Sequence, residues 1–163
     1  MKLEVQTVEL SGEKIGDREL VRRLWRYRSW MYLFSRKKSA QAVKSVFLRD
    51  SRVTKEGIQL LSVFERLAWL DLAGCQGLDA IALLRVGQLR SLTVLNLERT
   101  NTTDDWLPCL KMLFNLRWLG LDRTQITREA VCELRKFLPE PTIFSPFGIH
   151  YGPKMGGSYF GHL

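Results

Sequence analysis

The amino-acid sequence of 163 residues predicts an α/β solenoid, in which short parallel strands form one layer and returning helices form the other. Three observations support this fold class. A strand-like LxxLxL motif recurs at a nearly constant spacing, and apolar turn and helix positions follow each copy in the same register. The composition, 45% hydrophobic and 26% charged, is that of a soluble globular chain rather than a disordered one.

The LxxLxL motif sets the positions of the strands. Its four copies begin at 43, 67, 92 and 116, and their fourth residues are Val46, Leu70, Leu95 and Leu119. One further step of the repeat leads to Ile143 within a β-prone segment. Because alternate residues of a strand point to one face, we expect short parallel strands centred on these five residues.

The segments between the strands keep the same register. Apolar or small residues occupy equivalent turn positions at Val53, Leu78, Thr102 and Ile126. Apolar residues at helical spacing then predict helices near 55–65, 80–89, 104–114 and 128–138, with Thr54, Thr103 and Thr127 as N-caps. One such unit cannot bury its own apolar face, so the units must stack on one another.

The chain divides into three parts. Residues 1–42 are predicted to form a degenerate first repeat with a basic cap helix, residues 43–144 the regular repeats, and residues 145–163 an extended Gly-rich and aromatic arm. In the first part, the following residues match repeat positions or the apolar stripe of a helix over 17–34: Val5, Val8, Leu10, Ile15, Leu20, Leu24, Tyr27, Met31 and Phe34.

The extended motif LxxLxLxx(Cys/Thr), with Cys75, Thr100 and Thr124 at its ninth position, resembles the leucine-rich repeat family. It is similar to the cysteine-containing, ribonuclease-inhibitor-like branch over about residues 43–144. The resemblance implies a curved solenoid with parallel strands on the concave face and helices on the convex face. It also implies binding of partners on the concave face without catalysis. Thr102 and Pro108 depart from the usual pattern.

Positive charge is concentrated in one segment. Residues 18–55 contain twelve Lys and Arg against two acids, a net charge of +10, whereas the whole chain carries +8. Guanidinium groups bind phosphates in bidentate fashion, so this segment is a candidate polyanion-binding site. The charge does not distinguish RNA from an acidic protein or a lipid surface, and the alternative is a solvated outer face of the cap helix. The candidate residues are Arg18, Arg22, Arg23, Arg26, Arg28, Arg36, Lys37, Lys38 and Lys44.

A second candidate site lies on the outward side of the predicted strands and in the arm. Aromatic residues on an exposed sheet face favour partner binding, although a neighbouring loop or the chain's own arm could cover them instead. The candidate partner-binding residues are Phe47, Trp69, Asp71, Asn96, Trp118, Phe147, Tyr151, Tyr159 and Phe160.

The sequence predicts neither an enzyme nor a membrane span. The two histidines, His150 and His162, lie in the arm, and no nucleophile, metal-binding or phosphate-binding motif is present. We therefore expect no cofactor, metal or small-molecule substrate. Three cysteines in apolar segments predict buried, reduced thiols and hence an intracellular compartment, the mitochondrion or the cytoplasm. A presequence removed earlier would leave no trace.

These features together predict a non-catalytic subunit docked among other protein subunits of a larger assembly. The localised charge favours a ribonucleoprotein, such as an organellar ribosome, with RNA contacted through residues 18–55. An alternative is an adaptor, assembly factor or subunit of a mitochondrial membrane protein complex. A substrate-receptor module of a ubiquitin ligase is a lesser alternative, because residues 17–34 are too basic and too short for an F-box-like segment.

Overall fold

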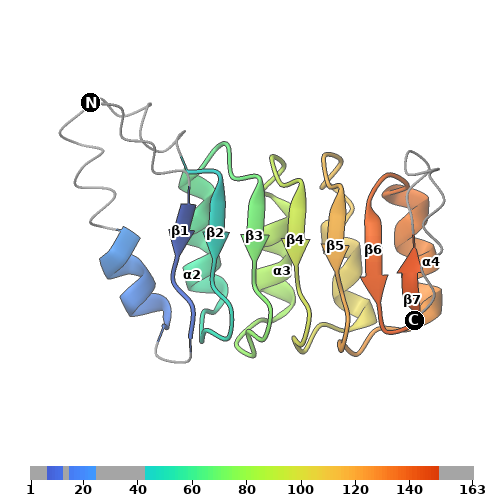
Figure 1. Cartoon of the computed structure of the whole chain (residues 1–163), viewed down its shortest axis with the longest axis horizontal. Coiled ribbons are helices and arrows are strands. Elements are labelled where there is room, and N and C mark those ends of the chain that lie inside the picture. Colours follow the sequence, from blue (N-terminus) through green and yellow to red (C-terminus); the bar gives the residue numbers. More distant parts are fainter. Residues whose placement is uncertain (1–6, 13–14, 25–42, 151–163) are drawn as a thin grey trace.

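In the computed structural model, which describes residues 7–12, 15–24 and 43–150, the strands lie side by side in chain order and the helices lie behind them (Figure 1). The five pairings from β1 to β6 are parallel, and β7 pairs with β6 in the antiparallel direction. The strands are β1 (Thr7–Glu9), β2 (Ser45–Phe47), β3 (Trp69–Asp71), β4 (Val94–Asn96), β5 (Trp118–Gly120), β6 (Thr142–Ser145) and β7 (Gly148–His150).

A helical segment follows each of the first five strands. Residues 17–24 are helical after β1, and the later segments are α2 (Lys55–Leu60) with the 3-10 turn η1 (Leu61–Val63), α3 (Ala80–Gly87), η2 (Asp104–Leu110) and α4 (Arg128–Phe137). Adjacent strands are about 4.8 Å apart, whereas packed helices need about 8–10 Å. The strand layer therefore forms the concave face of the stack.

The core is a column of aliphatic side chains that runs through all the parallel strands. The central residues of β1 to β6 pair in strict register and are at most 1% exposed; they are Val8, Val46, Leu70, Leu95, Leu119 and Ile143. Apolar residues of the helical layer close the column from behind, and Ile58, Leu83, Leu107 and Val131 are all buried. The predicted fold class, a leucine-rich-repeat solenoid, is confirmed, and β1 adds one more parallel strand beside β2.

The turns that follow the strands repeat one geometry. Four residues at the same repeat position, Asp50, Gly74, Arg99 and Arg123, have positive φ angles between 52° and 72°. At the ninth position of the motif, side chains donate hydrogen bonds to the carbonyl directly after a strand, which belongs to the preceding repeat for Cys75 and to their own repeat for Thr100 and Thr124. Cys75 Sγ donates to the Leu48 carbonyl at 2.9 Å, and Thr100 Oγ1 and Thr124 Oγ1 each donate to a carbonyl three residues earlier.

Thr102 departs from the usual apolar turn residue without leaving a buried hydroxyl unpaired. Its side chain is fully buried, and its Oγ1 lies 2.8 Å from Thr100 Oγ1 in a hydrogen bond. A buried hydroxyl with a partner avoids most of the desolvation penalty. The turn therefore tolerates Thr where the other repeats of this chain have Val53, Leu78 and Ile126.

Carboxylates of one repeat hold the helix start of the next repeat. Asp17 accepts hydrogen bonds from the backbone N–H of Thr54 at 2.9 Å and from its hydroxyl at 2.6 Å. Asp104 accepts the same pair of bonds from Thr127, at 2.7 and 2.8 Å. These contacts join segments 37 and 23 residues apart, so they stabilise the stacking of repeats as well as the helix starts.

The predicted N-caps are confirmed at two of three positions. The side chains of Thr54 and Thr127 accept bonds from their helices, as does Asp79 ahead of α3. The prediction for Thr103 is wrong, because its side chain forms no capping bond. The segment after it, predicted as a helix over 104–114, is the 3-10 helix η2 and contains Pro108. Proline lacks the N–H that an α-helix needs.

Two glycines allow the helical layer to pack closely. A Cβ on Gly57 would lie 2.3 Å from Asp17 Oδ1, and one on Gly87 would lie 2.0 Å from the Cys109 carbonyl oxygen. Neither distance is compatible with a real side chain. The absence of a side chain at Gly57 and Gly87 therefore brings α2 against the helix over 17–24, and α3 against η2.

Three further expectations differ from the structure or lie beyond it. Burial was predicted for all three thiols, but Cys75 alone is buried, while Cys109 is half-buried and Cys132 is exposed. The arm was predicted only to be extended, and within it residues 148–150 form the strand β7. Of the predicted helix over 17–34, residues 25–34 lie outside the described residues. Within the described ranges, no helix is long and apolar enough to cross a membrane.

Replacement of Leu95 by Ala should destabilise the fold by about 2–5 kcal/mol, because it removes a fully buried side chain from the centre of the column. Urea unfolding followed by circular dichroism measures this loss. The matched control is Ile81→Ala on α3, whose side chain is 47% exposed and whose replacement should change stability by about 0.5 kcal/mol or less. Equal losses in the two variants would contradict the buried column.

Candidate functional site

The concave face carries two rows of side chains that point away from the core. The pairing of β2 to β6 aligns Ser45, Trp69, Val94, Trp118 and Thr142 in the first row, and Phe47, Asp71, Asn96, Gly120 and Phe144 in the second. Trp69 and Trp118 are therefore in register across β4, with their backbones about 10 Å apart at two strand spacings. The two tryptophans occupy the same row, as the sequence spacing predicts.

Four aromatic rings on this face form two pairs. Phe47 and Trp69 have ring centroids 5.5 Å apart, and Trp118 and Phe144 have centroids 5.4 Å apart. Both pairs are tilted, at 55° and 40°, which is a favourable arrangement for aromatic rings. Trp69 is 42% exposed, and the other three rings are half-buried. The pairs lie on β2–β3 and β5–β6, on either side of β4.

Gly120 determines how the Trp118 ring lies on the sheet. A Cβ at position 120 would be 2.5 Å from Trp118 Cη2 and 2.8 Å from Asn96 Oδ1. The indole therefore occupies the space that a side chain at 120 would need. This close approach brings the ring onto the sheet surface beside Asn96.

Asp71 and Asn96 have structural roles in the centre of the face. Both are buried, at 0% and 6% exposure, so contrary to the prediction their side chains offer little surface to a partner. Each accepts a hydrogen bond from the backbone N–H two residues later, at 3.1 Å for Asp71 and 3.0 Å for Asn96. These bonds close the turn at the end of each strand.

Arg49 covers Asp71 and neutralises it. Its Nε donates to Asp71 Oδ2 at 2.5 Å, and the guanidinium is half exposed. The hydrogen bond from Arg49 to the carboxylate raises the pKa of Arg49 above its ordinary value. The ion pair links the turn after β2 to the end of β3, beside the Phe47–Trp69 pair, and leaves the centre of the concave face without a free negative charge.

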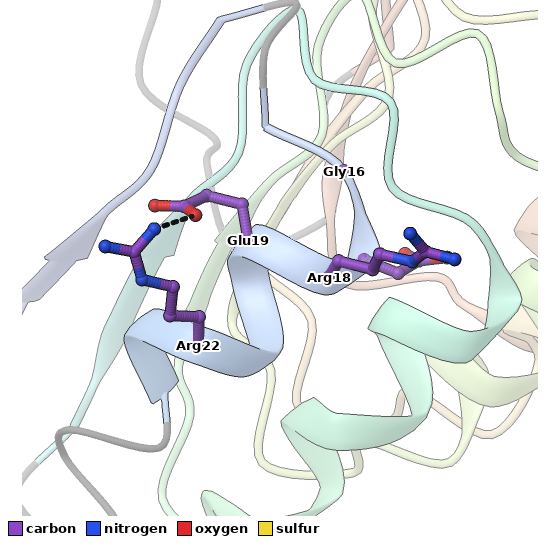
Figure 2. Close-up of a pocket in the computed structure, with 5 residues that line it drawn as sticks. Gly16, Arg18, Glu19 and Arg22 are labelled. Atoms are coloured by element: carbon purple, nitrogen blue, oxygen red, sulfur yellow. Dashed lines mark ion pairs between the residues drawn. The ribbon is translucent and has the colours of Figure 1, made fainter.

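The basic helix is only partly a free cationic surface. Arg23 Nε donates to Glu19 at 2.6 Å, and Arg22 lies 3.5 Å from the same carboxylate. The bond from Arg23 lowers the pKa of Glu19. Figure 2 shows an open hollow at the start of this helix, in which Arg22 turns toward Glu19 while Arg18 extends in another direction. The described arginines therefore do not converge on one phosphate-sized site.

Several predicted site residues cannot be placed. Of the polyanion set, Arg18, Arg22, Arg23 and Lys44 are described and have exposed side chains. The other five residues of that set lie outside the described residues; they are Arg26, Arg28, Arg36, Lys37 and Lys38. Three residues of the partner-binding set also lie outside them, namely Tyr151, Tyr159 and Phe160. For these eight residues the sequence predictions stay predictions.

Phe147 is the one arm aromatic among the candidates that the structure places. It is 41% exposed in the turn between β6 and β7, and the Arg128 guanidinium carbon lies 5.6 Å from its ring centroid. A cation near an aromatic face is a weak stabilising contact at an exposed site. Phe147 is thus held partly by α4 of its own chain.

The described residues contain no group of three or more His, Cys, Asp and Glu placed to hold a metal ion. Burial raises the pKa of the Cys75 thiol, and also that of Cys109, which disfavours the nucleophilic thiolate.

No protein-family model matches the chain, and no curated protein matches it in sequence. Among solved structures, the chain is similar to one in a structure of Mex67:Mtr2 subunits from Chaetomium, with 16% sequence identity and a TM-score of 0.46. The match covers 91% of this chain and 84% of that chain. The assignment of the fold rests on the strand register and turn contacts described above.

Replacement of Gly120 by Ala should displace the Trp118 ring and destabilise the fold by about 1–3 kcal/mol, because the added methyl group overlaps the indole. Near-ultraviolet circular dichroism should report the altered tryptophan environment, and urea unfolding the reduced stability. In a Trp118→Ala background the same substitution should cost less, since the main obstacle has gone. Equal costs in the two backgrounds would contradict this contact.

Proposed function

We propose that this chain is a non-catalytic leucine-rich-repeat subunit that binds a protein partner across its concave strand face. The observation that carries the proposal is the pair of aromatic clusters, Phe47–Trp69 and Trp118–Phe144, on an otherwise regular sheet. Partly exposed aromatic groups of this kind dominate the free energy of many protein interfaces. A helix or extended segment laid across β3 to β5 would contact both clusters.

The centre of the face suits a partner without a strong charge at its middle. Asp71 is buried and paired with Arg49, Asn96 bonds to its own turn, and Val94 stands between the two tryptophans. A partner side chain over β4 would therefore meet an apolar residue flanked by aromatic rings. An aliphatic or aromatic residue fits this position, whereas an unpaired charge would be desolvated without compensation.

We further propose a ribonucleoprotein, such as an organellar ribosome, as the host assembly. This proposal rests on the sequence, in which residues 18–55 carry a net charge of +10. Among the described residues of that segment, Arg22 and Arg23 pair with Glu19, Arg49 with Asp71, and Lys55 with Asp79. The RNA contacts should therefore depend mainly on the exposed Arg18 and Lys44 and on the five bases between residues 26 and 38.

Replacing Trp69 or Trp118 by Ala should weaken partner binding by about 2 kcal/mol or more, because each ring presents apolar surface that a partner can cover. The measurement is native purification of each tagged variant, followed by titration calorimetry against the partner recovered with the wild-type chain. Trp69→Ala should leave the thermal unfolding midpoint nearly unchanged, since the ring is 42% exposed.

The matched control for the tryptophan variants is Leu84→Ala on α3. Leu84 is 51% exposed and lies in the helical layer, away from the concave face. It should leave partner binding unchanged. Persistent binding by Trp69→Ala together with a large loss of its stability would make that residue part of the core rather than of an interface.

Replacing Arg26, Arg28, Arg36, Lys37 and Lys38 by Gln should weaken RNA retention, and the dependence of binding on salt should become shallower. The slope of log affinity against log salt falls by about one for each phosphate that the protein no longer neutralises. Filter binding of a structured RNA at several salt concentrations measures both. An Arg123→Gln control, whose ion pair with Asp122 lies outside residues 18–55, leaves the segment intact, and an unchanged slope in the fivefold variant would refute the RNA contact.

A further inference from the structure

The two edges of the solenoid differ in charge. At one edge the chain turns from helix to strand, through residues 61–68, 87–93, 111–117 and 135–141, and each of these turns is taken to include the last residues of the helical segment before it, such as η1 and Arg135–Phe137 of α4. These four turns hold six bases (Arg66, Arg90, Lys111, Arg117, Arg135 and Lys136) and two acids (Glu65 and Glu140). The strand-to-helix turns at the other edge, residues 49–54, 73–79, 98–103 and 122–127, hold four bases and four acids.

The edge with more basic residues also has more exposed apolar side chains. In the helix-to-strand turns, four large hydrophobic side chains are exposed: Val63 at 49%, Met112 at 43%, Phe114 at 62% and Phe137 at 47%. In the strand-to-helix turns between 49 and 127, all of which are described, there is none. The apolar and basic groups therefore gather at one edge, which we name the helix-to-strand edge.

Contacts between neighbouring turns make this edge one continuous surface. Lys111 Nζ lies 3.7 Å from the centroid of the Phe137 ring, which places a cation beside an exposed aromatic group. Asn115 donates a hydrogen bond to the Arg90 carbonyl at 2.9 Å. Figure 1 shows these turns in a row along one side of the sheet, where the polypeptide enters each strand.

Part of the positive charge at this edge is uncompensated. Arg117 pairs with Glu140 at 3.0 Å and Lys136 with Glu133 at 2.5 Å. In contrast, Arg66, Arg90 and Lys111 form no ion pair among the described residues. The edge thus presents free cations between apolar side chains.

We propose that the helix-to-strand edge is a peripheral docking surface for an anionic lipid membrane. Large apolar side chains surrounded by Lys and Arg suit such a membrane, because the apolar groups contact acyl chains while the cations contact acidic headgroups. The side chains protrude from a row of turns rather than line a groove, so they fit a flat, deformable surface better than a peptide. Two of the four exposed apolar side chains, Val63 and Met112, have no ring to stack on a base, which favours lipid over RNA as the partner.

In this arrangement Phe114 and Phe137 enter the boundary between headgroups and acyl chains, with Met112 beside them. Lys111 and Arg90 contact acidic headgroups at the same depth. The solenoid then stands on its edge, and its concave face remains open to the side. Membrane docking and protein binding by the concave face use different residues and can occur together.

The test is flotation of the full chain with vesicles of phosphatidylcholine containing about one-third phosphatidylserine, compared with pure phosphatidylcholine. The wild-type chain should float with the acidic vesicles and only weakly with the neutral ones. The triple variant Met112→Ser/Phe114→Ser/Phe137→Ser should bind the acidic vesicles about tenfold more weakly, since apolar insertion is lost. Comparable binding of the wild-type chain to neutral and acidic vesicles would overturn the proposal.

The matched control for the apolar groups is Ile81→Ser/Leu84→Ser on α3, whose side chains are 47% and 51% exposed. It removes similar apolar surface elsewhere and should keep wild-type vesicle binding. The segment 25–42 is common to all variants, so the difference between the two variants isolates the edge. A loss as large in the α3 variant as in the edge variant would refute the assignment of this surface.

A second pair of variants tests the charges independently. Arg66→Gln/Arg90→Gln at the helix-to-strand edge should weaken binding to acidic vesicles several-fold at about 0.1 M salt. Arg99→Gln/Arg123→Gln at the opposite edge should not. If the edge variants instead weaken binding of polyuridylate while vesicle binding is unchanged, the surface is an RNA site and the lipid proposal fails.

Discussion

Each parallel strand of this chain contributes one aliphatic side chain to a single interior column, and no strand can withdraw that side chain from water without a neighbouring strand and the helical layer. The strands are only three or four residues long, so the column, rather than the backbone pairing of any one strand, holds the register. Trp69 and Trp118 share a row on the outside because Leu70 and Leu119 share the column on the inside. The position of every candidate contact on the concave face depends on this burial.

The strands, their centres and the row of tryptophans were predictable because they depend on local periodicity. The 24- and 25-residue spacing of the LxxLxL motif specifies the strand centres, whose side chains point inward. The alternation of side chains along a strand then specifies which residues point outward. The burial of Asp71 was not predictable in this way, because its partner Arg49 lies 22 residues earlier. The same holds for Phe144, which was not predicted as a partner of Trp118. Its ring reaches the face only when β6 pairs beside β5.

Local chemistry also explains where the helical predictions failed. Repeat position alone makes residues 104–114 equivalent to the other helices, but Pro108 and the missing side-chain cap at Thr103 give a 3-10 segment instead. At the next turn the repeat requires Leu113 and Leu116 to be inward, and both are fully buried. Met112 and Phe114 are then left with no inward position. Packing of the solenoid core therefore does not explain why positions 112 and 114 are apolar.

The antiparallel pairing of β7 with β6 changes what the sheet can accept at that end. A further repeat of the same kind would have to supply a parallel strand beside β6, and β7 occupies that position. A new unit placed within the series of parallel strands would instead meet matching neighbours on both sides. The hairpin thus closes the β6 end of the array to evolutionary growth, and it would also prevent two copies from joining end to end into a filament through β6.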